Sequence, residues 1–451
     1  MPDLDSILAH AKALKIDECE AVLAKRRVTT IRITDSEIAE IKQNQEENLG
    51  LRLIHEKKIS TAQASPTQGI EILDKAHKMT SFLKPREFWK SLPSNVDASR
   101  IENTFDDNLE NIDGKKAADI AQEMINSASK EKITAISGSL NIVSEQFSLA
   151  NSNGLDFDDK ATYLSGMINA DSDTDGELVS GIGQQSCRTL DEFSPEKVGQ
   201  DASEMCLGSI NAKSCLPEEY SIIFEPYSVG ELLSFVFTSN FNQKTYSEKK
   251  SCFSDKIGNK VAVDEFSLID DPHASQGIGS KSVDDEGIKT KINPLIENGI
   301  FKNTYSDLFD AFKEEKESTG NGLRMGSPMG RDAEPIPAAA PHNLRIKSGD
   351  MSQDEMIKET KHGILVGRLW YTYAVNPIKG DFSCTARSGI RIIENGEIVS
   401  PGKPVRIVHN LPVLLKNISG IANNEKNVLQ WASLPSIAPS IRADGIRVNP
   451  I

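Results

Sequence analysis

The densest group of potential metal ligands in the chain is the segment SLIDDPHASQGIGSKSVDDEG at residues 267–287. A single histidine, His273, lies there among several acidic residues: Asp270, Asp271, Asp284, Asp285 and Glu286. Carboxylate oxygens are the ligands that hard cations prefer. Asp and Gly also favour tight turns with side chain-to-backbone hydrogen bonds, and the spacing fits no EF-hand loop. The turn interpretation is favoured, and whether the segment binds an ion stays open.

Two serines on one apolar segment, Ser234 and Ser239, are the candidates for nucleophilic chemistry. Neither has a histidine nearby in the sequence, and neither lies in a G-x-S-x-G motif, although a triad is recognised by geometry and not by sequence order. A serine hydrolase is therefore a minor alternative. The remaining histidines are dispersed, and His342 and His409 are expected to be loop or core residues.

The segment NPIKGDFSC, residues 376–384, combines polar side chains with the edge of an expected strand. Asn376, Gly380, Asp381 and Ser383 offer side-chain and backbone donors and acceptors there. These groups suit the segment to a binding role, and it is equally suited to form a tight turn between two strands. Both interpretations stay open.

One strand–helix unit must position the two serines. Residues 220–224 form an apolar run of strand length, and the S-x-x-E spacing of Ser228 and Glu231 predicts a capping box that starts a helix. The residues that follow are apolar all round, which is typical of a buried helix. This helix carries Ser234, Phe235 and Ser239.

The first 219 residues alternate between helical and strand periodicity, which predicts one α+β domain, 1–219. A helix, three or four antiparallel strands and a helix are expected, followed by a polar loop. A helix, three strands and a helix then follow, so the domain is expected to hold two similar blocks. The expected segments are a helix near 4–14, strands within 18–65, a helix at 69–83, a loop at 92–113, a helix at 115–130, strands near 133–149, 154–170 and 176–187, and a helix at 195–212.

After the central helix the patterns favour antiparallel strands. Asn298-Gly299 and Asn395-Gly396 each lie between apolar runs, which predicts hairpin turns of type I′. Residues 321–343 are rich in Gly, Pro, Ala and Met and are expected to form a long mobile loop. The fold class is thus α+β, with a second domain, 220–451, that is mainly antiparallel and barrel-like.

Composition excludes several functional classes. The formal net charge of −15 lacks the basic footprint of a nucleic-acid-binding surface. No run of 18 apolar residues and no basic n-region followed by an apolar core occurs, so neither a membrane segment nor a signal peptide is expected. The six scattered cysteines favour a reducing compartment, which makes the cytoplasm the expected location.

The chain resembles the TldD/PmbA family over most of its length. Besides residues 220–242, the resemblance rests on a series of phrases in one order: IDDPHASQGIGSKSVDDEG, PLIENG, STGN, SGDMSQDEMI, NPIKGDFS, IENGEIVSP and LLKNISGIANN. Catalytic members of this family are zinc metallopeptidases of the cytoplasm. The resemblance implies the same two-domain fold, and it implies that the segment 376–384 lies beside a peptide cleft.

The chain departs from the family pattern at the metal site. Catalytic members carry H-E-x-x-x-H on the central helix, and an ungapped count places Ser234, Phe235 and Ser239 at those three positions. The third ligand of the family is a cysteine near the C-terminus, whereas no cysteine follows Cys384, and the corresponding region is 423–436. A hydroxyl is a poor zinc ligand, and a phenyl ring cannot act as a general base.

This departure resembles the PmbA (TldE) branch, the non-catalytic partner of a TldD-type subunit. The resemblance implies no cofactor in this chain, zinc in a TldD-like partner, a heterodimer and an unfolded peptide as the substrate. The alternative is a homodimeric peptide-binding or regulatory protein without peptidase activity. Such proteins have been labelled modulators of DNA gyrase, but the acidic charge argues against direct contact with DNA. An active peptidase with a relocated metal would need ligands that the sequence does not offer.

Overall fold

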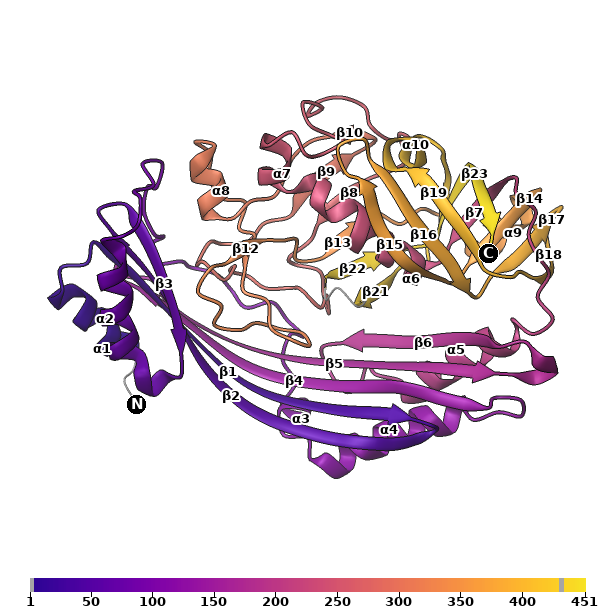
Figure 1. Ribbon diagram of the computed structural model, residues 1–451, viewed down its shortest axis with the longest axis horizontal. Helices are drawn as coiled ribbons and strands as arrows, with labels where there is room; N and C mark the ends of the chain where they lie inside the picture. Colours follow the sequence, from indigo (N-terminus) through magenta and orange to yellow (C-terminus); the bar gives the residue numbers. More distant parts are fainter. Residues whose placement is uncertain (1–3, 430–433) are drawn as a thin grey trace.

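The N-terminal part of the molecule is a long, curved antiparallel sheet. The computed structural model describes residues 4–429 and 434–451. Six strands follow the order β3-β2-β1-β4-β5-β6, and several of them are unusually long (Figure 1). Their bounds are β1 (Glu18–Thr34), β2 (Glu37–His55), β3 (Lys58–Ala64), β4 (Ala135–Asn151), β5 (Asp156–Ser172) and β6 (Val179–Cys187). Antiparallel strands were predicted within residues 18–65, and the structure joins them by hairpin turns at Asp35 and Glu56, which both have a positive φ.

Two helix pairs stabilise the two ends of this sheet. Helices α1 (Leu4–Ala13) and α2 (Gly69–Thr80) enclose one apolar cluster with β1 and β2. Helices α4 (Gly114–Ala128) and α5 (Pro195–Leu207) enclose a second cluster with β4 and β5, and α3 (Asp107–Glu110) precedes them. The order helix, three strands, helix therefore occurs twice, and β1 and β4 join the two blocks.

The C-terminal part lies over the concave face of the long sheet (Figure 1). Its largest sheet follows the path β15-β16-β19-β23-β7-β14-β17-β18, and β20 also pairs with β23. The bounds are β7 (Glu219–Phe224), β14 (His362–Val366), β15 (Arg368–Asn376), β16 (Asp381–Ser388), β17 (Arg391–Glu394), β18 (Glu397–Pro401), β19 (Val405–Asn410), β20 (Ile418–Ile421) and β23 (Ile441–Pro450). Only β7 and β14 pair in parallel within it.

A second sheet and several short helices complete this part. The sheet order is β10-β9-β8-β13-β22-β21, and β11 pairs with β12 apart from it. The bounds are β8 (Leu268–Asp270), β9 (Asn293–Glu297), β10 (Ile300–Phe301), β11 (Gly322–Leu323), β12 (Ala338–Ala339), β13 (Leu344–Ile346), β21 (Lys426–Leu429) and β22 (Pro435–Ala438). The helices are α6 (Pro226–Leu232), α7 (Gln243–Ser247), α8 (Leu308–Lys313), α9 (Gln353–Glu359) and α10 (Leu411–Lys416).

The mixed α+β class is confirmed, but the barrel-like arrangement is not. The path of the large sheet ends at β15 on one side and at β18 on the other, so the described strands do not close on themselves. A large apolar core fills the space between the two sheets and around α6. The predicted type I′ turns are present, with positive φ at Asn298-Gly299 and at Asn395-Gly396. Among the described residues, no helix is long and apolar enough to cross a membrane.

The prediction of a mobile loop at 321–343 is wrong. Arg324 and Arg331 in this segment are buried, and they form ion pairs with Glu20 on β1 and Glu145 on β4. Arg26 on β1 donates to the carbonyl of Met329 at 2.7 Å. The segment is therefore packed between the two parts of the molecule, because its arginines find acidic partners on the long sheet.

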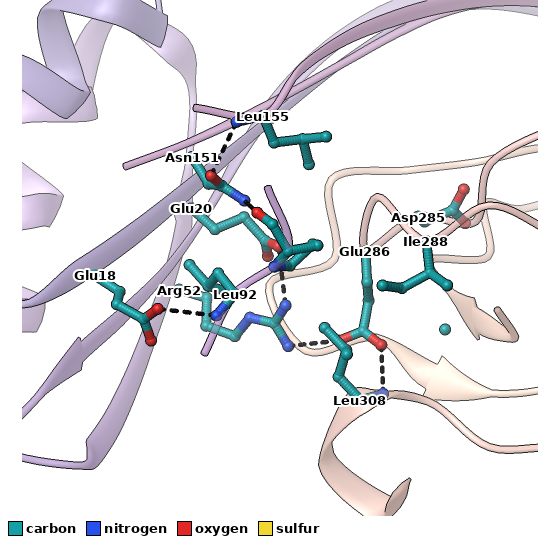
Figure 2. A network of polar contacts seen from close by, with 12 residues as sticks. Glu18, Glu20, Arg52, Leu92, Asn151, Leu155, Asp285, Glu286, Ile288 and Leu308 are labelled. Atoms are coloured by element: carbon teal, nitrogen blue, oxygen red, sulfur yellow. Dashed lines mark hydrogen bonds and ion pairs between the residues drawn. The ribbon is translucent and has the colours of Figure 1, made fainter. Parts of the chain in front are cut away.

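A buried ion-pair network joins the two parts at the same place, because Glu20, which pairs with Arg324, also pairs with Arg52. Arg52 on β2 donates to Glu20 Oε2 at 2.9 Å and to Glu286 Oε1 at 2.7 Å (Figure 2). Glu286 also accepts a hydrogen bond from the backbone N–H of Leu308 at 2.8 Å. All three charged side chains are at most 5% exposed. Glu286 thus holds the C-terminal part against the sheet.

Candidate functional site

The three positions that correspond to the family's metal motif lie on one irregular helical segment. Helix α6 continues without a break into a π-helical turn, Leu233–Phe237, and a 3-10 turn, Thr238–Phe241. Ser234 and Phe235 are half-buried in the π-helical turn, and Ser239 is exposed. The predicted buried helix is confirmed, and π-helical turns are often found at functional positions.

The capping box predicted for this helix is wrong. The N-cap is Glu225, with Pro226 at the first helical position, so Ser228 and Glu231 lie inside the helix. The Ser228 hydroxyl donates to the carbonyl of Val366 at 2.9 Å. Proline at the first turn is itself a helix-start signal, and it lies closer to the end of the preceding strand than the serine does. A capping box is present at α9, between Ser352 and Glu355.

Glu231 is a buried acid one turn before Phe235. The sequence pattern indicates Glu231 only as part of a capping box and misses its burial beside the motif positions. Its side chain packs beside Arg368 and Thr372 of β15, and the residue is 3% exposed. Burial raises the pKa of Glu231 to about 7, and the hydroxyl of Thr372 and the charge of Arg368 offset part of the rise. This carboxyl can hold a proton near neutral pH.

Replacing Glu231 by glutamine is expected to stabilise the protein at pH 8 by about 3 kcal/mol. The folded state binds this proton more tightly than the unfolded state, so the carboxyl lowers stability as pH rises from about 4.5 toward 7. The glutamine has no proton to lose, and the two proteins should have equal stability near pH 4.

Urea unfolding at pH 4 and pH 8 measures this difference in the free energy of unfolding. The matched control is Glu123→Gln at an exposed position of α4, which should change stability little at either pH. An E231Q protein no more stable than the wild type at pH 8 would contradict the expected burial cost.

A groove follows the free edge of β6, the last strand of the long sheet. Three cavities of about 710, 270 and 340 Å³ lie along this strand, lined in turn by Val179 and Ser180, by Ile182, and by residues 184–187. Their opposite walls come from the C-terminal part: Trp370, Arg387 and Arg406, then Glu225 and Arg391, and then Lys426 and Asn427.

The backbone of β6 is only partly engaged on the groove side. The N–H of Ile182 faces away from β5 and meets Met205 Sδ at 3.5 Å, a weak contact, and the Tyr227 hydroxyl donates to the carbonyl of Gln184. The backbone N–H and C=O groups of every second residue face the same side of a strand. Those of Ser180 and Ser186 therefore face the groove, like those of Ile182 and Gln184. Tyr227 belongs to the first turn of α6 and lines two of the cavities. The groove therefore meets the start of the helix that carries Phe235, whereas Ser234, Phe235 and Ser239 do not line these three cavities.

Unpaired polar atoms also lie in this groove. Gln184 Nε2 and Asn427 Oδ1 are buried without a hydrogen-bond partner in the part of the chain that the structure describes, and both residues line the 340 Å³ cavity. A buried amide group without a partner is costly. Such groups are suited to hydrogen-bond a ligand or water in the groove.

The segment 376–384 forms the turn between β15 and β16. The N–H of Gly380 donates to the carbonyl of Asn376 at 2.9 Å, and Gly380 has a φ of +84°. Asp381 accepts a hydrogen bond from Asn410 at 2.9 Å, and Ser383 accepts one from Arg406 at 3.2 Å. This turn lies at the far end of the hairpin from β6 (Figure 1), and its side chains do not line the three cavities. The turn geometry is as expected, and contact with a peptide stays a prediction.

The carboxylates of 267–287 are each occupied by protein donors. Asp270 accepts hydrogen bonds from the N–H groups of His342 and Asn343 and from the side chain of Asn321. Asp271 pairs with Arg345 at 3.1 Å, and Asp285 pairs with Lys281. Asp284 accepts hydrogen bonds from three backbone N–H groups. The one histidine of the segment, His273, contacts the hydroxyl of Thr290 at 3.0 Å. These contacts support the turn interpretation.

Comparisons with known proteins place the chain in a family. The PmbA/TldA metallopeptidase C-terminal domain model matches residues 217–450, and the central domain model of the same family matches residues 107–209. The chain belongs to the TldD/PmbA family. A metalloprotease of Methanothermobacter thermautotrophicus is 25% identical over 405 residues, which are 88% of this chain and 86% of the relative.

Solved structures of the TldD/PmbA family share the fold. TldE from Thermococcus kodakarensis superposes with a TM-score of 0.90 at 23% identity, over 99% of both chains. A Thermotoga maritima protein described as a candidate modulator of a DNA gyrase gives a TM-score of 0.87 at 22% identity, again over 99% of both chains. At these identities the likeness establishes the architecture.

The donor set of this TldD/PmbA chain does not fit the zinc ion that the family implies. Two hydroxyls and a phenyl ring, on Ser234, Ser239 and Phe235, occupy the motif positions. Zinc sites in proteins are built from imidazole, thiolate and carboxylate. Part of the region expected to supply the third ligand, residues 430–433 of 423–436, lies outside the described residues. Within the described residues, no group of three His, Cys, Asp or Glu side chains is placed to hold a metal.

Proposed function

We propose that this chain is a TldE-like, non-catalytic subunit of a cytoplasmic zinc metallopeptidase. It pairs with a TldD-like catalytic subunit that carries the zinc and the general base, and the pair hydrolyses unfolded peptides. This chain completes the peptide-binding cleft. The proposal goes beyond family membership, because the family includes both catalytic and non-catalytic members.

The observation that carries the proposal is Phe235. A metallopeptidase needs a base that accepts a proton from the metal-bound water. The side chain at that position here is a half-buried phenyl ring, and hydroxyls flank it at Ser234 and Ser239. Glu231, one turn earlier, packs against Arg368 and Thr372. A role that leaves hydrolysis to a partner fits this arrangement best.

The groove along β6 supports a role in holding the peptide. An extended peptide can add to a free strand edge through main-chain hydrogen bonds, which makes binding tolerant of sequence. Such tolerance suits unfolded substrates. The six cysteines are all buried and unpaired, which supports the cytoplasm as the compartment.

Affinity purification of this chain from its native host tests the partnership. A TldD-like subunit carrying the H-E-x-x-x-H motif is expected to co-purify in equal amount, and light scattering should report the mass of a heterodimer. The alternative function, a homodimeric peptide-binding or regulatory protein, predicts a particle of twice 49.4 kDa containing this chain alone. That second result, obtained in cells that also make a TldD-like protein, would refute the partnership.

A further inference from the structure

A small cavity lies under the packed segment 321–343, apart from the groove along β6. It has a volume of about 50 Å³, and its walls include Tyr163 of β5 and the apolar side chains of Met325 and Met329. Met325 is 49% exposed, so one wall of the cavity is at the molecular surface. Lys281 and Arg324 also line it, together with two residues that each carry a nitrogen unpaired among the described residues, Arg331 and His342.

Each of these two side chains has one buried nitrogen without a partner. Arg331 Nη1 and His342 Nδ1 make no hydrogen bond within the described residues, although the two residues are only 3% and 1% exposed. The other nitrogens are engaged. Arg331 Nε donates to Glu145 at 2.6 Å and Nη2 to Asp159 at 2.9 Å, and His342 Nε2 lies 2.7 Å from the carbonyl oxygen of Gly320. Two residues that line one cavity thus each have an unsatisfied polar atom, which points to a ligand because such an atom is costly when left unpaired.

The protonation state of His342 decides whether its unpaired nitrogen donates or accepts a hydrogen bond. A carbonyl oxygen can only accept, so Nε2 carries the hydrogen that bonds Gly320. Burial and the nearby charge of Lys281 lower the pKa of His342 to about 4, so the ring is neutral at pH 7. His342 Nδ1 is then an acceptor, whereas Arg331 Nη1 is a donor. The cavity offers one donor and one acceptor.

Charge and size narrow the class of ligand. Arg331 is neutralised by Glu145 and Asp159, Lys281 by Asp285 at 2.9 Å, and Arg324 by Glu20. No uncompensated positive charge is left among these groups to hold an anion, which favours a neutral ligand. One water needs about 10–15 Å³ of such volume, so the cavity has room for a group of roughly three to four non-hydrogen atoms. A carboxamide has this size, one carbonyl acceptor and N–H donors.

We propose that this cavity binds a neutral carboxamide, as found in a peptide group or in an Asn or Gln side chain. Its carbonyl oxygen accepts from Arg331 Nη1, its N–H donates to His342 Nδ1, and its carbon substituent packs against Met325 and Met329. The site belongs to this chain alone and does not depend on the proposed partnership. A failure of one proposal therefore leaves the other standing.

The two methionines make the site measurable in the isolated full chain. With ¹³C-methyl-labelled methionine, acetamide is expected to shift the Met325 and Met329 signals along a saturating curve, and Met→Leu variants assign the signals. Acetone lacks the donor, and acetate is charged. Both should shift these two signals at least tenfold less at equal concentration. No saturable shift with acetamide, or an equal response to acetone, would show that the cavity holds water only and would overturn the proposal.

His342→Gln separates the site from the fold. The glutamine Nε2 can keep the hydrogen bond to Gly320, but the acceptor at the Nδ1 position is lost, because the amide oxygen is bonded to Cδ and not, like Nδ1, to Cγ. Acetamide affinity should fall about tenfold, as for the loss of one hydrogen bond. His409→Gln, on β19 outside the cavity, is the matched control and should bind normally. If the H342Q protein does not fold, Met325→Trp is the second variant, because the larger side chain should close the half-exposed wall of the cavity. The same loss of acetamide affinity is then expected, measured from the Met329 signal. Unchanged affinity in the folded variant contradicts the proposal.

Discussion

Replacing Arg52 by methionine is expected to lower the free energy of unfolding by about 3 to 5 kcal/mol. Arg52 lies between Glu20 and Glu286, with N···O distances of 2.9 and 2.7 Å, and the side chains are buried (Figure 2). Methionine fills a similar volume but leaves Glu286 without its ion-pair partner at an interface where the residue is fully buried. Removing one partner of a buried pair costs far more than the pair contributes at the surface.

Urea unfolding at pH 7 measures this effect, and Arg32→Met is its matched control. Arg32 lies on β1 of the same sheet but is exposed, so its loss should change the free energy of unfolding by no more than about 0.5 kcal/mol. The uncompensated carboxylate of the R52M protein should also make its stability rise as pH falls toward 5. A loss below about 1 kcal/mol for R52M would show that the network does not hold the two parts together.

If the proposed heterodimeric peptidase binds its substrate along β6, replacing Ser180 by proline is expected to reduce its peptide turnover about tenfold. The N–H of Ser180 faces the groove, as does that of Ile182 two residues later, which contacts Met205. Asp171 is the β5 partner of Ser180, and its carbonyl faces the opposite side, where it accepts from the N–H of Thr134. Proline removes the N–H of Ser180 without breaking the ladder to β5, and edge strands accept it. The loss of one main-chain hydrogen bond of about 0.5–1.5 kcal/mol accounts for the size of the effect.

The control for this experiment is Ser180→Ala, which keeps the N–H and removes only the contact of the hydroxyl with Ser388 at 3.2 Å. Its kcat/KM for an unfolded peptide should stay within twofold of the wild type. Thermal unfolding and co-purification with the partner are checked for both variants. A folded, assembled S180P complex with normal turnover would contradict strand addition at β6.

Local chemistry explains what could be predicted from the sequence. The turns at Asn298-Gly299 and Asn395-Gly396 were predictable because their residues accept a positive φ without help from distant neighbours. The buried helix after Tyr220 was predictable because its apolar residues leave no polar face. The substitution at Phe235 is visible without any structure.

Long-range partners explain what could not be predicted. The composition of 321–343 suggested mobility, yet Arg324 pairs with Glu20 and Arg331 with Glu145, more than 180 positions away in each case. The S-x-x-E spacing at Ser228 occurs inside a helix as readily as at its start, and only the observed boundary at Pro226 distinguishes the two. The groove depends on β6 being the last strand of its sheet. No local pattern encodes the order of strands.

The zinc content and peptide turnover of the purified chain, alone and after mixing with a TldD-like subunit, test the central claim most directly. We expect the isolated chain to carry no stoichiometric zinc and to leave an unfolded peptide intact. We expect the mixture to cleave the peptide, with one zinc for each pair of subunits, and a chelator to abolish cleavage. Stoichiometric zinc in the isolated chain, with chelator-sensitive turnover, would contradict the account.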